Sequence, residues 1–363
     1  MNNRMGINSD IEKLILTQLQ DVKDPETGRS IAKSKQIHEV NEIDGEIQVK
    51  VGMTSFASPV KQDFHQSVEE AVRRACPERK ISVTIAHHDR PAQPMGTVGL
   101  TAKAVIAVGS GKGGVGKSTS ATCLAMALQR SGCRVGLLDA DVYGPSIPHL
   151  TGVRGQVTKA DDKIGPLDFN GIPLISIGFM VPPDQAVIWR GPMLHSAVTT
   201  FVRDVAWGNL DYLIIDMPPG TGDIALSLSQ LLPITGTVIV CTPQEVALID
   251  AIKAVAMFEK VNIPIIGMIE NMSSFICPDT GKQYDIFGKG GAKTYAEQAQ
   301  LPFLGEIPIN IQMRERGDEG AMGANFDDPQ VAPYLEKIAY QLVKHLSQQA
   351  AAKPVQPQLP VLG

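Results

Sequence analysis

The sequence lacks any apolar run long enough to span a bilayer, and its first ten residues are mostly polar, without the apolar core of a secretory signal. It also lacks a strong charge of either sign: 33 Lys and Arg against 38 Asp and Glu give a net charge of −5, with no basic stripe. Nucleic-acid-binding domains usually carry such a stripe. We therefore expect a cytoplasmic protein that binds neither nucleic acid nor membrane.

Cysteine is scarce, odd in number and scattered along the chain, which argues against a disulfide framework. Three of the five, Cys123, Cys133 and Cys241, lie in apolar helix or strand patterns and are expected to be inert core residues. Cys76 also lies in a helical pattern, so Cys277 is the cysteine with the best prospect of a chemical role.

With 363 residues and 43% hydrophobic content, the chain is long enough for two domains. Helical and alternating patterns predict a small α+β domain over residues 1–88. Residues 89–102 have no apolar period and are expected to form a linker. The preceding His87 and His88 are expected to be solvated, at the start of the same irregular stretch. A metal site at the two histidines is the alternative, but no acid or cysteine cluster accompanies them.

Strand and helix patterns alternate from residue 103 onward, and each strand is a nearly continuous apolar run. Such runs suit strands that are buried on both faces of a mainly parallel sheet. A helix at residues 334–346 has an apolar stripe with few basic neighbours, which favours a docked core helix over a membrane-surface anchor. The second domain is thus expected at 103–348, followed by a disordered tail at 349–363.

The most informative segment is a glycine-rich loop at residues 111–119, Gly-Lys-Gly-Gly-Val-Gly-Lys-Ser-Thr. It follows an apolar strand pattern at 104–108 and precedes a helical one, which is the context that a phosphate-binding loop requires. Its backbone N–H groups and the helix N-terminus would surround phosphate oxygens. Lys117 would reach the β and γ phosphates, and Ser118 would offer its hydroxyl to Mg²⁺. The fold class is therefore α/β, a mainly parallel P-loop NTPase sheet with helices on both faces, preceded by the small α+β domain.

Acidic residues follow two later strand patterns directly. Asp139 and Asp141 come after one apolar run and Asp216 after another, each followed by a segment rich in glycine and proline. Helix capping or turn formation is the alternative for Asp139 and Asp141. Because these strands would neighbour the phosphate loop, we favour a nucleotide site with Asp216 as a Mg²⁺ ligand and switch loops after both acids. No histidine or cysteine lies in these segments, so phosphoryl transfer to water is the expected chemistry.

These motifs together resemble the deviant Walker A ATPases of the MinD and nitrogenase-iron-protein class, and within it the Mrp/ApbC iron-sulfur cluster carriers. The resemblance covers about residues 10–345, because Asp24-Pro25-Glu26-Thr27-Gly28 is similar to a segment of the small domain often fused ahead of these carriers. Further matching segments are Trp189-Arg190-Gly191-Pro192, Thr242-Pro243-Gln244 and Ile269-Glu270-Asn271-Met272-Ser273.

The resemblance implies a homodimer that binds and hydrolyses ATP with Mg²⁺ and passes clusters to apoproteins. Lys112 would contact phosphate across the dimer interface, Asp141 would activate the attacking water, and Asp139 would assist at Mg²⁺. Asn271 would meet adenine, and a loop around Pro308 would close over it. The implied cofactor contacts are Gly111, Lys112, Gly113, Gly114, Val115, Gly116, Lys117, Ser118, Thr119, Asn271 and Pro308.

The chain departs from the family pattern at one point. Carriers of this kind usually have Cys-x-x-Cys after the Asn-Met-Ser segment, whereas this sequence has Cys277-Pro278-Asp279-Thr280. Threonine is a poor ligand for an iron-sulfur cluster, so a dimer offers only the two Cys277 thiolates here. Three hypotheses follow: an ATPase that carries clusters, a MinD-like ATP-switched dimer that recruits a partner without a cluster, and a small-molecule-modifying P-loop enzyme such as a synthetase.

Overall fold

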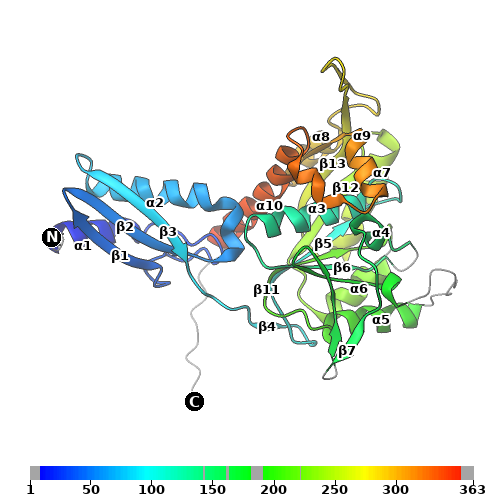
Figure 1. The fold of residues 1–363 in the computed structure, drawn as a ribbon, viewed down its shortest axis with the longest axis horizontal. Helices are drawn as coiled ribbons and strands as arrows, with labels where there is room; N and C mark the ends of the chain where they lie inside the picture. Colours follow the sequence, from blue (N-terminus) through cyan, green and yellow to red (C-terminus); the bar gives the residue numbers. More distant parts are fainter. Residues whose placement is uncertain (1–8, 142–143, 161–162, 181–190, 221, 353–363) are drawn as a thin grey trace. The chain divides into compact units, whose positions relative to one another are not determined.

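The computed structural model describes residues 9–141, 144–160, 163–180, 191–220 and 222–352. The chain divides into two compact units, one made of residues 1–90 and 343–363 and the other of residues 91–342 (Figure 1). The division falls within the last helix, α10 (Ala332–Ala352). The expected second domain at 103–348 therefore differs from the observed unit at both ends.

The first unit is a small α+β fold, as the sequence predicts. It comprises α1 (Ser9–Leu19), β1 (Ile37–Ile43), β2 (Glu46–Met53), η1 (Ser55–Val60), α2 (Lys61–Ala75) and β3 (Lys80–His87). β2 pairs antiparallel with β1 and parallel with β3. The sequence analysis did not predict β1, although Asp44-Gly45 is a hairpin signal and both residues have the positive φ of a two-residue turn.

His87 and His88 do not begin a solvated linker. His87 is the last residue of β3, and the His88 N–H donates to the Met53 carbonyl at 2.9 Å. The expected linker at 89–102 is also shorter, because β4 (Pro94–Met95) pairs with the start of β5 (Leu100–Gly109). Hydrogen bonding between strands, which composition does not reveal, orders these residues.

The second unit is built on a sheet of ten strands within the described residues. Six of them, in the order β13-β12-β5-β11-β6-β10, run parallel. They are β5, β6 (Val135–Asp139), β10 (Ile172–Ser176), β11 (Leu210–Asp216), β12 (Gly236–Cys241) and β13 (Ile265–Ile276). β15 (Phe303–Ile309) pairs parallel with β13, and antiparallel strands β4, β9 (Leu167–Phe169) and β14 (Gln283–Tyr284) complete the sheet.

Helices cover both faces of this sheet, as expected. Side chains from α5 (Gly191–Arg203), α6 (Gly222–Leu231), α7 (Glu245–Lys260) and α8 (Gly291–Gln298) share one core with Val105, Leu138 and Leu213. Helix α3 (Lys117–Arg130) packs on β5, β6 and β11 and contributes none of the described residues of that core, so it covers the other face. The remaining elements are α4 (Ile147–Thr151), β7 (Thr158–Ala160), β8 (Lys163–Gly165), η2 (Ile177–Phe179), α9 (Ile311–Asp318) and η3 (Met322–Asp327).

A buried ion pair anchors the first unit. Asp24 is fully buried and accepts hydrogen bonds from the Thr27 hydroxyl at 2.6 Å, the Gln36 amide at 3.1 Å and the Arg90 guanidinium at 2.7 Å. Burial raises the pKa of Asp24, but the Thr27 hydrogen bond and the Arg90 charge outweigh it and hold the pKa below its ordinary value. These contacts connect the segment after α1 to the end of β3.

We predict that Asp24→Asn destabilises the first unit at pH 7 by about 3 kcal/mol, because Arg90 then loses its buried partner. A depressed folded-state pKa contributes stability above the unfolded value of about 3.9, and this contribution is lost as the pH falls through the folded value. The gap between the native chain and the variant should therefore shrink below pH 4. Hydrogen exchange of the β2 amides and urea unfolding, each at pH 7 and pH 3, measure this difference in stability. An unchanged exchange rate at pH 7 would contradict the prediction.

Candidate nucleotide site

The phosphate loop connects β5 to α3, in the strand-loop-helix arrangement that the motif requires. Gly114 and Gly116 adopt left-handed φ values of 79° and 80°, which favour glycine. A Cβ on Gly116 would lie 2.0 Å from Asn271 Nδ2, and one on Gly111 would lie 2.0 Å from the Asp250 carbonyl oxygen. Glycine is therefore required here both by backbone conformation and by close packing.

Lys117 is the cation at the centre of the site. It is buried, and its Nζ lies 2.7 Å from Asp216 Oδ1, 3.6 Å from Asp141 Oδ2 and 3.2 Å from Ser118 Oγ. One ammonium group thus stands between two carboxylates. The structure brings together four of the residues that the sequence analysis assigned to the site.

The register of the sheet explains this convergence. Asp216 ends β11 and lies opposite Val108 of β5 and Asp139 of β6, all in parallel ladders. The Ala140 N–H donates to the Asp216 carbonyl at 2.9 Å, which holds the start of the segment after β6 against β11. Since parallel strands end at the same edge, their terminal acids lie beside the phosphate loop.

Asp139 has a different environment from Asp141. It is fully buried, and its carboxylate accepts hydrogen bonds from the Ser176 hydroxyl at 2.9 Å and from the Asp141 N–H at 3.1 Å. Burial, followed by the nearby Asp216 charge, raises the pKa of Asp139 to about 8. Oδ1 thus holds the backbone of Asp141, and Oδ2 ties Asp139 to the end of β10. The sequence analysis missed Ser176, because nothing in the sequence reveals which strand end borders β6.

Asp216 offers a free ligand atom. Its Oδ2 is buried and has no hydrogen-bond partner among the described residues. Burial raises the pKa of the Asp216 carboxyl, although the nearby charge of Lys117 opposes that rise. An unpartnered buried carboxylate oxygen is unfavourable, so this atom suits a cation or its bound water. The described residues contain no group of three or more His, Cys, Asp and Glu side chains that could hold a metal ion. Mg²⁺ would therefore depend on Ser118, Asp216 and the nucleotide phosphates.

Asn271 lies directly against the phosphate loop. Its side-chain amide donates to the Val115 carbonyl at 2.8 Å, and both residues are buried. Its neighbour Glu270, to which the sequence assigned no role, accepts hydrogen bonds from the N–H groups of Gly290 and Ala292, both at 2.9 Å, and caps α8. The structure thus ties the loop to β13, and β13 to α8.

The loop expected around Pro308 is instead a strand. Pro308 is buried within β15, whose Ile307 pairs with Asn271 of β13. Among the described strands, β15 pairs only with β13, so it is an edge strand. Proline is tolerated in an edge strand because the backbone N–H that it lacks is not needed on the side without a neighbouring strand. Pro308 therefore lies in a strand and not in the expected loop, and its contact with adenine stays a prediction.

Comparison with known proteins identifies the family. Residues 101–343 match the model of the NUBPL iron-transfer P-loop NTPase family, and residues 12–85 match that of an iron-sulfur cluster assembly protein. The chain belongs to the NUBPL iron-transfer P-loop NTPase family. This confirms the resemblance described above and supports nucleotide binding by this chain.

Relatives cover most of the chain. It is 44% identical to the iron-sulfur cluster carrier protein of Deinococcus radiodurans over 93% of this chain and 94% of the relative. It is 42% identical to the iron-sulfur cluster transfer protein NUBPL of Dictyostelium discoideum over 82% of this chain and 93% of that relative. A nucleotide-binding protein of Archaeoglobus fulgidus, solved in complex with ADP, is 40% identical, covers 61% of this chain and 88% of its own, and gives a TM-score of 0.55.

Other expected features of this P-loop NTPase remain predictions. Lys112 is half-buried at the rim of the loop, and its carbonyl accepts a hydrogen bond from Ser110 at 3.0 Å. Val142, Tyr143, Trp189, Arg190 and Thr221 lie outside the described residues. No described helix combines the length and apolar character needed to cross a bilayer.

Cys277 lies in a tight turn between β13 and β14. Its N–H donates to the Lys282 carbonyl at 3.0 Å, and its carbonyl accepts from the Gly281 N–H at 2.8 Å. The Thr280 hydroxyl and the N–H groups of Thr280 and Asp279 donate hydrogen bonds to the sulfur and lower the pKa of the Cys277 thiol. Thr280, in the usual position of the second cysteine, thus stabilises the thiolate of the first.

We predict that Asp139→Asn stabilises the nucleotide-free, Mg²⁺-free chain increasingly as the pH rises from about 5 to 8. A raised folded-state pKa means that the native state holds a proton that the unfolded state has lost, so stability falls with pH in this window. The asparagine side chain has the same shape as the aspartate side chain but does not bind or release a proton in this pH range. Urea unfolding of both chains across this range measures the effect, with Asp168→Asn on the exposed β9–β10 turn as a control. A pH-independent difference would show that Asp139 is ionised throughout.

Proposed function

We propose that this chain is a Mg²⁺-dependent ATPase that carries iron-sulfur clusters and transfers them to apoproteins. The observation that carries the proposal is the shared ammonium group of Lys117 between Asp141 and Asp216 at the phosphate loop. Similarity to proteins named iron-sulfur cluster carrier protein and iron-sulfur cluster transfer protein supports the proposal that the chain carries such clusters. ATP hydrolysis and cluster transfer are expected to take place in the cytoplasm.

Lys117 is expected to act as an electrostatic switch. An incoming γ-phosphate competes with the two carboxylates for its ammonium group, because phosphate carries more charge than either acid. Asp216 then has its carboxylate free for the metal, together with the Ser118 hydroxyl. Bound Mg²⁺ supplies charge neutralisation on the β and γ phosphates. Asp141 is released to orient water, on a backbone that Asp139 holds in place.

We also propose that two copies form the working unit. Lys112, at the exposed rim of the loop, would reach the phosphates of the partner subunit and add a second cation there. Asn271 and the buried end of β15 at Pro308 would border the adenine, because they lie on the side of the loop away from Asp216 along the strand order. The dimer would place the two Cys277 turns as protein anchors for the cluster.

We predict that Lys117→Ala abolishes ATP hydrolysis and leaves the fold intact, because the phosphates lose their main side-chain counter-charge. Asp141→Asn should lower the hydrolysis rate of bound ATP much more than it weakens ATP binding. Single-turnover hydrolysis and nucleotide titration separate these effects. Lys253→Ala, which removes an exposed lysine paired with Asp250 on α7, is the matched control. Normal turnover by Lys117→Ala would refute the site assignment.

We predict that Cys277→Ser abolishes the iron and sulfide that the reconstituted dimer retains, and that Thr280→Cys increases both. The two Cys277 thiolates cannot complete the usual four-thiolate site, so the native cluster should be labile and completed by other ligands. Anaerobic reconstitution with iron and sulfide counting and absorption spectroscopy measures this. Cys76→Ser, in the first unit, is the control. A stable cluster that survives Cys277→Ser would place the site elsewhere.

The second candidate function is an ATP-switched dimer that recruits a partner without a cluster. Thr280 in the position of the second cysteine favours it. Both functions need the same ATP site, so cluster retention decides between them. A native dimer that retains no iron, while Lys117→Ala still loses hydrolysis, would support the second function.

A further inference from the structure

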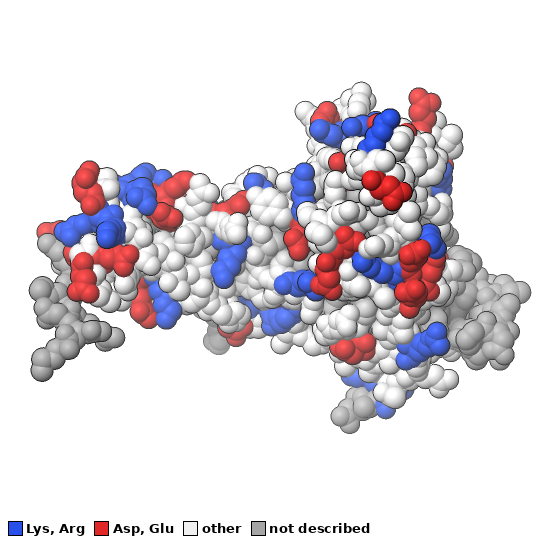
Figure 2. Space-filling view, turned by 45° about the horizontal axis from the view of Figure 1, so that its top comes forward, with Lys and Arg blue, Asp and Glu red and all other residues white. Residues whose placement is uncertain are grey.

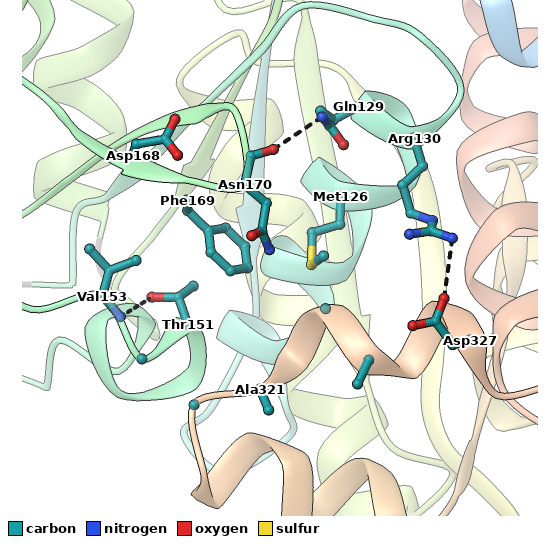
Figure 3. A pocket seen from close by; sticks show the side chains of 14 residues that line it. Met126, Gln129, Arg130, Thr151, Val153, Asp168, Phe169, Asn170, Ala321 and Asp327 are labelled. Carbon is teal, nitrogen blue, oxygen red and sulfur yellow. Dashed lines mark hydrogen bonds and ion pairs between the residues drawn. The ribbon is translucent and has the colours of Figure 1, made fainter.

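A cavity of about 610 Å³ lies in the second unit (Figure 3). Its walls come from the C-terminal ends of α3 and α4, the turn between β9 and β10, and the segment from α9 into η3. The described residues that line it include none from the phosphate loop and neither Asp139 nor Asp216. Small-molecule pockets typically occupy about 300–1,000 Å³, so this second cavity has a suitable size.

Close backbone packing forms one side of the cavity. Gly152, after α4, and Gly320, after α9, have φ values of 68° and 73°. A Cβ on Gly152 would lie 2.8 Å from the Gly320 carbonyl oxygen, and one on Gly320 would lie 2.5 Å from the Gly152 Cα. Any other residue would force these segments apart, so the wall depends on both glycines.

The cavity offers charges of both signs and an apolar floor. Arg130 lies 3.5 Å from Asp327 and over the Phe326 ring at 5.3 Å, and the side chains of Arg130 and Asp327 are 46% and 74% exposed. An exposed pair at this distance contributes little stability, so a ligand can replace it at small cost. Phe169 is buried at the floor, and Figure 3 shows it beside Met126 and Asn170.

The β9–β10 turn is held in place beside these groups. The Gln129 amide of α3 donates to the Asn170 carbonyl at 3.1 Å, and Asp168 accepts the Gly171 N–H at 3.1 Å. Asn170 has a φ of 52°, a left-handed turn conformation that asparagine tolerates. The turn therefore presents an amide and a second carboxylate on a defined backbone, opposite Arg130.

We propose that this cavity binds a small zwitterion, a short peptide or amino-acid derivative with free ammonium and carboxylate ends and an apolar side chain. The carboxylate pairs with Arg130, the ammonium group pairs with Asp327 or Asp168, and the apolar side chain packs on Phe169 and Met126. This arrangement converts one weak exposed ion pair into two charge-assisted contacts. A dianion is disfavoured because two carboxylates line the cavity against one guanidinium.

The site is separate from the nucleotide site but shares a helix with it. α3 begins at Lys117 and ends at Arg130. A rise of about 1.5 Å per residue places Gln129 about 18 Å along the helix from Lys117. The zwitterion therefore does not compete with ATP for contacts.

Titration of the full chain with the dipeptide leucyl-glycine tests the proposal. We expect saturable binding by calorimetry, with about tenfold weaker binding after N-acetylation or C-amidation, since a charge-assisted contact contributes about 1.5–3 kcal/mol. Arg130→Gln should weaken binding of the free dipeptide about tenfold and leave binding of the C-amidated dipeptide unchanged. Asp327→Asn should likewise weaken binding of the free dipeptide about tenfold and leave binding of the N-acetylated dipeptide unchanged.

Arg314→Gln and Asp318→Asn are the matched controls, because these residues form an exposed ion pair on α9 outside the cavity. They should leave dipeptide binding unchanged. Gly323→Leu should abolish binding and preserve nucleotide binding, since a Cβ there points toward Met126 and Asn170 at 3.2 and 3.3 Å. Lys117→Ala should lose ATP hydrolysis and retain dipeptide binding, which separates this proposal from the ATPase. Absence of saturable binding, or equal binding of the free and capped dipeptides, would overturn it.

Discussion

The shared ammonium group of Lys117 is the interaction on which the nucleotide site depends. Two carboxylates, Asp141 and Asp216, stand within 4 Å of this single buried cation, and they would repel each other without it. The pair forms only because β5, β6 and β11 end at one edge of a parallel sheet. The position of Lys117 thus couples the two acids to each other by charge.

The second level of organisation holds the acids in position. Asp139 connects the Ser176 hydroxyl at the end of β10 to the backbone of Asp141. Asn271 connects β13 to the Val115 carbonyl of the phosphate loop, and Glu270 connects the same strand to α8. The Asn271 amide thus holds the phosphate loop to β13, and Asp139 holds the start of the segment after β6.

The surface of Figure 2 carries acidic and basic side chains interspersed. This agrees with the small net charge and gives no large field of one sign. We therefore propose recognition at three particular sites: the phosphate loop, the Cys277 turn and the cavity beside Arg130. In the Cys277 turn, hydrogen bonds from Thr280 and Asp279 lower the pKa of the thiol.

The sequence by itself determined the phosphate loop, the parallel sheet, the small first unit and the membership of Lys117, Ser118, Asp141 and Asp216 in one site. Each depends on local order, since a strand, a glycine loop and a helix follow one another in the chain and acids follow strands directly. The tertiary structure was needed to show that Ser176 donates to Asp139 while Asp139 accepts from the Asp141 N–H, that Pro308 lies in a strand, and that the ends of α3 and α4 line a cavity. These features join residues that are distant in the sequence, such as Asp139 and Ser176, which are 37 positions apart. They depend on strand order and helix packing, which no local pattern encodes.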